Sequence, residues 1–223
     1  MRARLAAVGA IALVTALLFL PVFVGLATGA PRWFAWDVPE QYWPDLVYAC
    51  EALHDGALPL WNPYDRAGYP YYADPQAAAY HPTTWVICAL SSSPSMGWAT
   101  ARVILGFFLA GAFGLLWLRR LDVPWSGAIV GAVVIEAAPF MRHNWELNLT
   151  GALAYLPLML WAADRAVIER GARDGLLLGL AVALSAWMGS PPALWLSASF
   201  VLLYAAGRLA GQARAHGRVA LAE

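Results

Sequence analysis

The 223-residue chain is 61% hydrophobic and only 13% charged, and its mean hydropathy is +0.57. This composition excludes an ordinary soluble domain and is typical of a protein that crosses the bilayer several times. The formal net charge is zero, so the chain has no overall positive field and we expect no nucleic acid partner. We therefore predict an all-α fold in which residues 1–223 form a single membrane domain, with the lipid bilayer as a partner.

The first apolar segment covers residues 5–29 and follows a basic start at Arg2 and Arg4. It ends in small residues, as a signal-peptide cleavage site does. Its apolar run is about 25 residues long, however, whereas the core of a signal peptide has about 7–15. We therefore favour an uncleaved transmembrane helix at residues 1–29. Cleavage is the alternative, and it would leave the next segment on the same side of the membrane.

A polar loop at residues 30–82 separates this helix from the rest of the apolar sequence. It contains seven of the chain's fourteen carboxylates and eight of its fifteen prolines. A chain that only spans the bilayer does not need such a segment, so we expect the loop to hold a ligand at the membrane surface. The seven carboxylates are Asp37, Glu40, Asp45, Glu51, Asp55, Asp65 and Asp74.

We predict a helix from Asp37 to about residue 53, lying on the membrane surface. Asp37 and Glu40 have the spacing of a capping box, and Gly56 can end the helix in the left-handed conformation. Asp37 is then either a capping residue or a catalytic carboxylate above the first span, and the two roles are compatible. The apolar face predicted for this helix consists of Leu46, Ala49, Cys50 and Leu53.

The second half of the loop, residues 57–82, is predicted to be irregular because proline recurs along it. Its aromatic side chains form either an interfacial belt or a surface that stacks on sugar rings or covers a lipid headgroup. Asp65 and Arg66 are expected to form a local ion pair, although Arg66 can instead hold a phosphate. The aromatic residues in question are Trp61, Tyr64, Tyr69, Tyr71, Tyr72 and Tyr80.

The sequence predicts about six transmembrane helices, because a span needs roughly 20 mainly apolar residues. Residues 83–90 are too short to span and predict a re-entrant or interfacial piece. The helices after the loop lie within residues 83–207, and residues 208–223 form a basic tail. The six predicted spans are 5–29, 96–118, 123–140, 150–163, 175–190 and 193–207.

The distribution of arginine predicts a cytoplasmic N-terminus, because positive charge is enriched in cytoplasmic segments. With this orientation ten arginines lie inside, and the loop at residues 30–82 is extracytoplasmic. Arg32, Arg66, Arg102 and Arg142 lie outside or near the outer surface. Cys50 and Cys88 are on or near the same side, where a disulfide is chemically permitted. The sequence alone leaves their pairing open.

Glu136 is an ionisable residue inside the third predicted span. Because a charge that faces lipid is costly, we expect it to face the helix bundle with a partner such as Arg142 or His143. A structural ion pair and a site residue are both compatible with this pattern.

Two patterns in the first loop resemble a known family. The first is D-x-x-x-Q-x-x-P at Asp37, Gln41 and Pro44. The second runs from Gly56 to Pro82 as G-x-L-P-L-W-N-P-Y, G-Y-P and A-D-P-Q. Together they resemble the bacterial YfhO-like membrane proteins, which are grouped with the GT-C type glycosyltransferases.

Weaker similarity to the same family continues downstream. It covers Arg142-His143-Asn144 with Asn148, and then Tyr155-Leu156-Pro157-Leu158. At residues 189–192 the chain has Gly-Ser-Pro-Pro where the family pattern is closer to Gly-His-Pro-Gln. Members of the family are usually much longer, so the chain resembles the N-terminal portion of one.

The resemblance implies an enzyme of the bacterial inner membrane. It would transfer a sugar from a polyprenyl-phosphate donor to a cell-envelope glycan acceptor. Asp37 matches the expected catalytic carboxylate, and the sequence does not decide whether a divalent cation takes part. The alternative is a non-enzymatic polytopic protein, such as a transporter subunit or a lipid-handling component. The substrate-binding residues expected from the motifs are Glu40, Gln41, Arg66, Asp74, Gln76, Arg142 and His143.

Overall fold

A computed structural model describes residues 2–34, 37–143 and 147–220, and within these ranges the chain is helical apart from turns and one isolated bridge. The N-terminal half contains α1 (Arg2–Leu18), α2 (Leu20–Ala27), the π-helical turn η1 (Val38–Tyr42), α3 (Trp43–His54), the 3-10 turns η2 (Tyr71–Ala73) and η3 (Pro75–Ala77), and α4 (Pro82–Leu90). The remaining helices are α5 (Met96–Arg120), α6 (Trp125–Glu136), α7 (Pro139–His143), α8 (Leu147–Ala154), α9 (Leu156–Glu169), α10 (Ala172–Trp187) and α11 (Pro191–Ala220). The predicted all-α fold is confirmed for the described residues.

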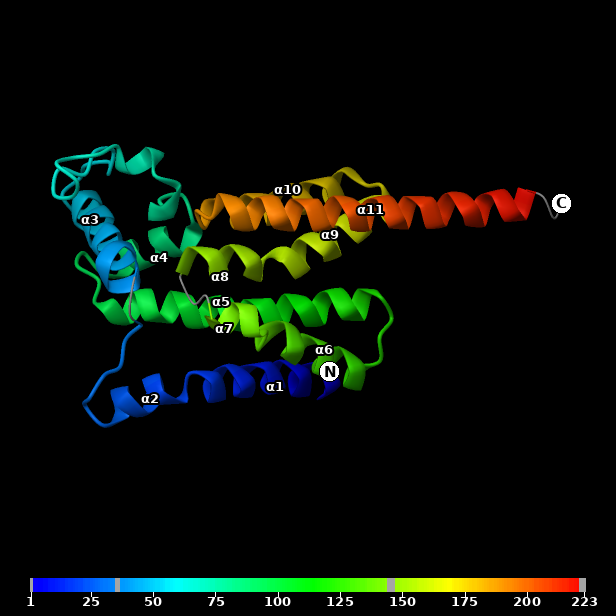
Figure 1. Cartoon of the computed structure of the whole chain (residues 1–223), viewed down its shortest axis with the longest axis horizontal. Coiled ribbons are helices and arrows are strands. Elements are labelled where there is room, and N and C mark those ends of the chain that lie inside the picture. Colours follow the sequence, from blue (N-terminus) through cyan, green and yellow to red (C-terminus); the bar gives the residue numbers. More distant parts are fainter. Residues whose placement is uncertain (1, 35–36, 144–146, 221–223) are drawn as a thin grey trace.

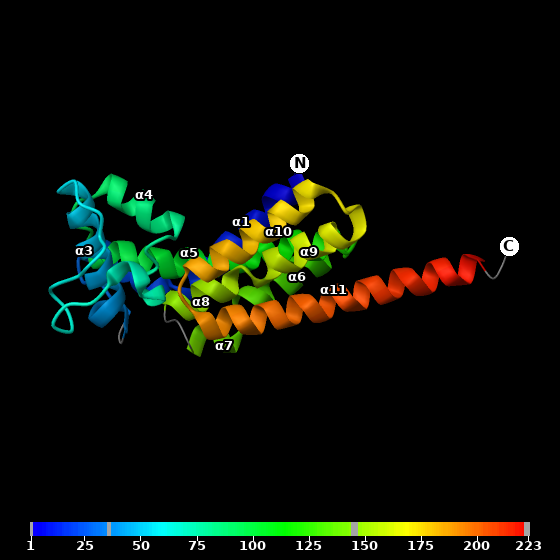
Figure 2. The same cartoon turned by 90° about the horizontal axis from the view of Figure 1, so that it is seen from above.

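The long helices lie side by side along one axis, and the first loop with α3 and α4 covers one end of them (Figure 1). Helix α5 is central, because it packs against α1, α6, α8 and α9, while α10 and α11 pack on α9. The N-terminus lies toward the other end of the bundle, and the last turns of α11 project beyond the other helices (Figures 1 and 2). The first loop therefore covers one end of the bundle, which we call the capped end, and the N-terminus lies toward the opposite end.

Among the residues that the structure describes, three helical segments are long and apolar enough to cross a membrane, namely Met96–Arg120, Asn148–Glu169 and Pro191–Arg214. The pair α1 and α2, which is bent by 71° at a break between them, would be a fourth if the two helices form one span. Pro21 lies in the first turn of α2 and accounts for the break, because proline removes a backbone donor and its ring clashes with the preceding turn. Helices α6 and α10, which correspond to two of the six predicted spans, have only 12 and 16 residues and do not meet the same length criterion. The six-span topology therefore stays a prediction.

Small residues let α5 approach its neighbours closely, as they do at the contacts between membrane helices. A Cβ added to Gly106 would lie 3.7 Å from the Cα of Gly151 in α8. One added to Gly111 would lie 2.9 Å from a carboxylate oxygen of Glu136. Glu136 is fully buried, and the hydroxyl of Thr15 in α1 is its hydrogen-bond partner. The prediction that Arg142 or His143 pairs with Glu136 is therefore wrong, because α1 supplies the nearest polar group.

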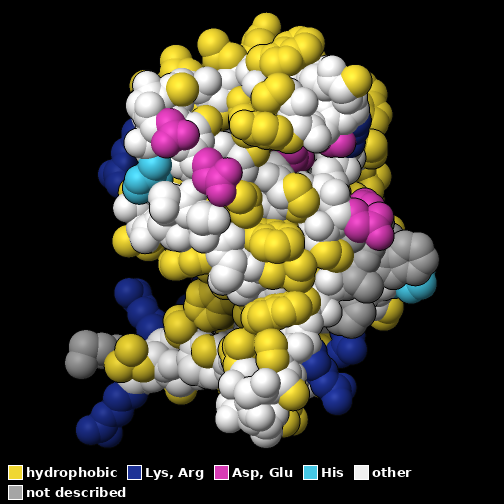
Figure 3. Space-filling view, turned by 90° about the vertical axis from the view of Figure 1, so that its left-hand side faces the viewer, with side chains coloured by type: hydrophobic (Ala, Val, Ile, Leu, Met, Phe, Trp, Pro, Cys, Tyr) yellow, Lys and Arg dark blue, Asp and Glu magenta, His cyan; other side chains and the backbone are white. Residues whose placement is uncertain are grey.

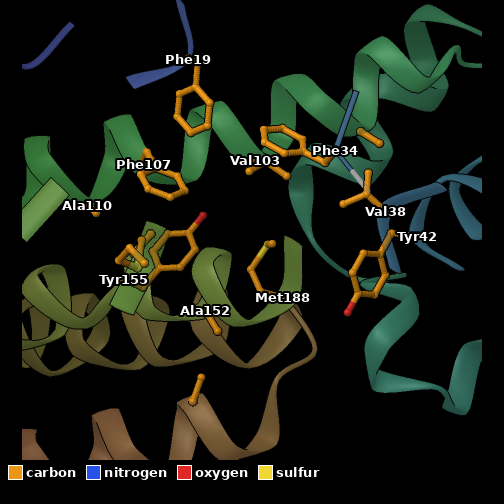
Figure 4. Close-up of a cluster of buried hydrophobic side chains, with 14 residues drawn as sticks. Phe19, Phe34, Val38, Tyr42, Val103, Phe107, Ala110, Ala152, Tyr155 and Met188 are labelled. Carbon is orange, nitrogen blue, oxygen red and sulfur yellow. The ribbon is translucent and has the colours of Figure 1, made fainter. Parts of the chain in front are cut away.

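The start of the loop is anchored in the main hydrophobic core (Figure 4). Val38 and Tyr42 of η1 are buried with Phe34, next to Val103 of α5. Tyr155 and Met188 belong to the same core (Figure 4). Residue 37 is thus held directly against the helix bundle by its neighbour Val38.

A second core holds the loop together around α3. Leu46, Ala49 and Cys50 of α3 are buried against Tyr71 and Ala77 from the later loop and against Ile87 and Cys88 of α4. The apolar face predicted for this helix is therefore confirmed. It packs against other parts of the protein, whereas a helix lying on the membrane surface would bury this face in lipid. Cys50 and Cys88 form a disulfide with a Cα–Cα distance of 4.6 Å. This bond joins α3 to α4 across a separation of 38 residues.

The predicted end of α3 is confirmed and its predicted start is not. Gly56 has φ +77°, and the N–H of Ala57 donates to Ala52, as in a left-handed helix cap. At the start, Asp37 has right-handed helical angles and its side chain makes no capping hydrogen bond. The capping box with Glu40 is wrong because the first turn is a π-helix, in which the backbone groups pair with a different spacing.

Candidate functional site

The candidate site lies on the capped end of the bundle, where η1 meets the later part of the loop. Figure 3 looks at this end and shows acidic side chains spread over a surface that is otherwise largely apolar or uncharged. The sequence placed most of the candidate residues in this loop. What the structure adds is which of them come together.

Four polar residues from three separate segments meet here, and we call them the amide cluster: Gln41, Asp74, Gln76 and Asn148. The side chain of Gln41 donates to the side-chain oxygen of Gln76 at 3.2 Å. The backbone N–H of Gln76 donates to Asp74 at 2.8 Å, which fixes the turn that presents Gln76. Asn148 of α8 donates to the backbone oxygen of Gln76 at 2.7 Å. The two glutamines of the family-like motifs are therefore in direct contact.

The turn between α10 and α11 packs against the loop segment that carries Gln76. Gly189 has φ +81°, and a Cβ at this position would lie 1.7 Å from the backbone oxygen of Pro75. The backbones of the two segments therefore touch, and only glycine fits between them. Asn148 is buried, and its side-chain oxygen has no hydrogen-bond partner among the described residues.

Asp37 lies one helical turn before Gln41 and is half-buried. Because its side chain does not cap the helix, its carboxylate is available for another role. Glu40 is exposed on the same turn. The structure therefore brings Asp37 and Gln41 to the same short helix, next to the segment that carries Gln76.

Arg66 lies in a turn closed by the bridge between Asn62 and Tyr69. Its guanidinium is 3.4 Å from the carboxylate of Asp65 and 3.9 Å from that of Asp74, and it stacks over the ring of Tyr69. The local ion pair predicted from the sequence is confirmed. The contact with Asp74 also links Arg66 to the amide cluster.

Arg142 and His143 do not join this cluster. Both are exposed at the end of α7, and neither side chain forms a hydrogen bond or an ion pair with another described residue. Asn144, which follows them in the family-like segment, lies outside the described residues. Any role for Arg142 and His143 would require a ligand that reaches beyond the amide cluster.

Asp45 is a residue of this site that the sequence reasoning missed. It is 3% exposed, and it accepts a hydrogen bond of 2.5 Å from the hydroxyl of Tyr69. Burial raises the pKa of Asp45 to about 6, although the hydrogen bond from Tyr69 acts in the opposite direction. Its position four residues after Gln41 was a usable signal, because residues at this spacing share a helix face.

The raised pKa of Asp45 predicts that stability falls as the pH rises from about 4 to about 6. The folded state binds the proton more tightly than the unfolded chain, whose value is near 3.8, so deprotonation favours unfolding. The expected loss is up to about 3 kcal/mol. Thermal unfolding in detergent as a function of pH measures it. Asp45→Asn should remove this dependence, and Asp55→Asn, at an exposed position, should keep it. Parallel profiles for wild type and Asp45→Asn would show that Asp45 is not the titrating group.

Among the described residues there is no group of three or more His, Cys, Asp or Glu side chains that could hold a metal ion. We therefore assign no metal ligand. The arrangement offers carboxylates near neutral amides, with Arg66 as the nearest cation. This combination can orient hydroxyl groups and accept a proton.

Over the described part of the chain, the fold and the site define a helical protein with three helices long and apolar enough to span a membrane and a structured polar cap on one end. No family model, curated protein or solved structure matches the chain. The resemblance to YfhO-like proteins therefore depends on the motifs alone.

Proposed function

We propose that the chain is a membrane-embedded glycosyltransferase of YfhO-like type, or the N-terminal part of one. It transfers a sugar from a polyprenyl-phosphate donor to a cell-envelope acceptor outside the bacterial inner membrane. The observation that carries this proposal is the contact between Gln41 and Gln76, because it unites the two loop motifs on which the resemblance rests. Asp37, from the first motif, is one helical turn away.

The proposed topology has six spans with a cytoplasmic N-terminus, in which α6 and α10 cross together with the residues that follow them. The ion pairs at the end of the bundle away from the loop support this orientation. Asp164 of α9 pairs with Arg120 at 2.7 Å and with Arg208 at 2.7 Å, and Arg165 pairs with Asp174. Arginine thus concentrates at the end opposite the loop, as expected for the cytoplasmic side. The disulfide supports an extracytoplasmic loop, because such bonds persist in oxidising compartments.

In this mechanism Asp37 acts as the general base that takes a proton from the acceptor hydroxyl. Gln41 and Gln76 orient the sugar or the acceptor by hydrogen bonds, and Asn148 holds the backbone of Gln76 in place. Arg66 lies beside Asp74 and can balance negative charge on the leaving group.

The substitution Asp37→Asn tests the proposal, since it keeps the shape of the side chain and removes the base. We expect transfer from polyprenyl-phosphate hexoses, measured in membranes from cells that express the protein, to fall by at least about 100-fold. Asp55→Asn is the matched control on the same loop and should leave transfer unchanged. If Asp37→Asn transfers normally, Asp37 is not the base. If Asp45→Asn loses transfer instead, the buried carboxylate takes that role.

One observation favours the second candidate, a non-enzymatic transport or lipid-handling protein. Glu136 is fully buried among α1, α5 and α6, and one of its carboxylate oxygens has no hydrogen-bond partner among the described residues. Buried ionisable groups inside membrane bundles often mark transport pathways. Loss of function in Glu136→Gln together with full function in Asp37→Asn would favour this candidate.

A further inference from the structure

Arg102 is a buried cation that no described carboxylate neutralises. It lies in α5 near the capped end and is only 6% exposed. Two of its guanidinium nitrogens, Nε and Nη2, have no hydrogen-bond partner among the described residues, and no described carboxylate forms an ion pair with it. An unpaired buried charge is strongly destabilising, so a protein that retains one gains something from it other than stability.

His81 and Tyr155 line the same cavity as Arg102 and are hydrogen-bonded to each other. His81 precedes α4, and both the backbone N–H and the hydroxyl of Thr83 lie within hydrogen-bond distance of its Nδ1. Burial lowers the pKa of His81 to about 3, so the ring is neutral and Nδ1 accepts these bonds. Its Nε2 then carries the hydrogen and donates to the hydroxyl of Tyr155 at 2.9 Å. Tyr155 is therefore left with its own O–H free to donate to a third group.

Two cavities meet at Arg102. The first has a volume of about 20 Å³ and is lined by residues that include His81, Tyr155, Met188 and Arg102. It has room for a single oxygen atom or a water molecule. The second is a groove of about 250 Å³ between α4 and α5 that is lined by Val86, Trp98 and Leu105 and also reaches Arg102. Thr83, Arg102 and Leu105 line both cavities, so the small cavity and the apolar groove are adjacent.

We propose that Arg102 and Tyr155 bind the phosphate group of a lipid whose hydrocarbon chain lies in the groove between α4 and α5. The guanidinium fork fits two phosphate oxygens, and one oxygen can enter the small cavity to accept from Tyr155. The groove provides the apolar surface that a lipid chain needs, and it lies along α5, one of the helices long enough to span the membrane. That this lipid is the sugar donor rests on the proposed function, whereas the binding itself does not.

This proposal predicts opposite effects of Arg102→Gln on stability and on binding. Without ligand the variant should unfold at a higher temperature than wild type, because it removes an uncompensated buried charge. Its affinity for a lipid phosphate should fall by about tenfold or more, because bonds between charged partners are lost. A purely structural arginine would lower stability when replaced.

The experiment uses the full chain, purified in a maltoside detergent that contains no phosphate, with hexadecyl phosphate as the probe in calorimetric titrations. Arg102→Gln is compared with Arg32→Gln, which removes an exposed arginine from the same side. Leu105→Trp fills the groove, and its control is Val130→Trp at an exposed position on α6. We expect Arg102→Gln and Leu105→Trp each to weaken binding by about tenfold or more, and both controls to bind like wild type. Asp37→Asn should also bind normally, which separates this site from the proposed catalysis.

Unchanged affinity in Arg102→Gln would overturn the proposal. Inorganic phosphate is titrated separately to identify the source of the phosphate group. If it bound as tightly as hexadecyl phosphate, and Leu105→Trp had no effect, the site would bind a free anion and the lipid assignment would be wrong. Weak binding of inorganic phosphate together with loss of binding in Leu105→Trp would support the lipid.

Discussion

Replacing Gly189 by alanine is expected to destabilise the protein by more than about 3 kcal/mol and to detach the loop from the bundle. Two costs add at this position. The residue has φ +81°, which costs a residue with a side chain roughly 1–2 kcal/mol. The new Cβ would also lie 1.7 Å from the oxygen of Pro75, so the backbone of the loop must move. Movement of residues 75–76 breaks the hydrogen bond from Asn148 and the contact between the two glutamines.

Two other glycines separate these costs. Gly56 has φ +77° but open space around its Cβ position, so Gly56→Ala measures the conformational strain alone. Gly179 lies within α10 and is also open, so Gly179→Ala should be neutral or slightly stabilising. Thermal unfolding and limited proteolysis of the loop measure the effects. If Gly189→Ala were no more destabilising than Gly56→Ala, the α10–α11 turn would not hold the loop.

The sequence predicted the helical fold and part of the candidate site, because both depend on local patterns. Long apolar runs mark the helices, and the spacing of Asp37 and Gln41 placed both on one short helical segment. The contact between Gln41 and Gln76 depends instead on how the loop folds back over 35 residues. No local pattern specifies that return, and the structure supplies it through Gly189 and Asn148.

The residues that the sequence reasoning missed are those whose role depends on long-range partners. Asp45 belonged to an apparently polar face of its helix, but Tyr69 covers it. Arg102 interrupts an apolar span, and a charge inside such a span was a signal that pointed to a site. The predicted partners of Glu136 were close in sequence, whereas its actual partner Thr15 is 121 residues away.

Removing the disulfide between Cys50 and Cys88 is expected to lower the free energy of unfolding by about 2–4 kcal/mol. The bond closes a loop of 38 residues, and its loss restores conformational freedom to the unfolded chain. For a chain of this size that corresponds to a fall in unfolding temperature of about 5 to 15 °C. Reductant should lower the unfolding temperature of wild type to that of the Cys50→Ser/Cys88→Ser variant and leave the variant unaffected. Equal unfolding temperatures for oxidised wild type and the variant would contradict this prediction.

The same bond tests the orientation on which the proposed function depends. In cells that express the protein, a maleimide reagent added under denaturing conditions should modify neither cysteine unless a reductant is added first. The structure places both cysteines in the bond, so modification without reductant would mean that it does not form in the cell. Because the cytosol keeps thiols reduced, that result would place the loop on the cytosolic side. A cytosolic loop could not act on an acceptor outside the membrane, and the glycosyltransferase proposal would then fail together with the topology.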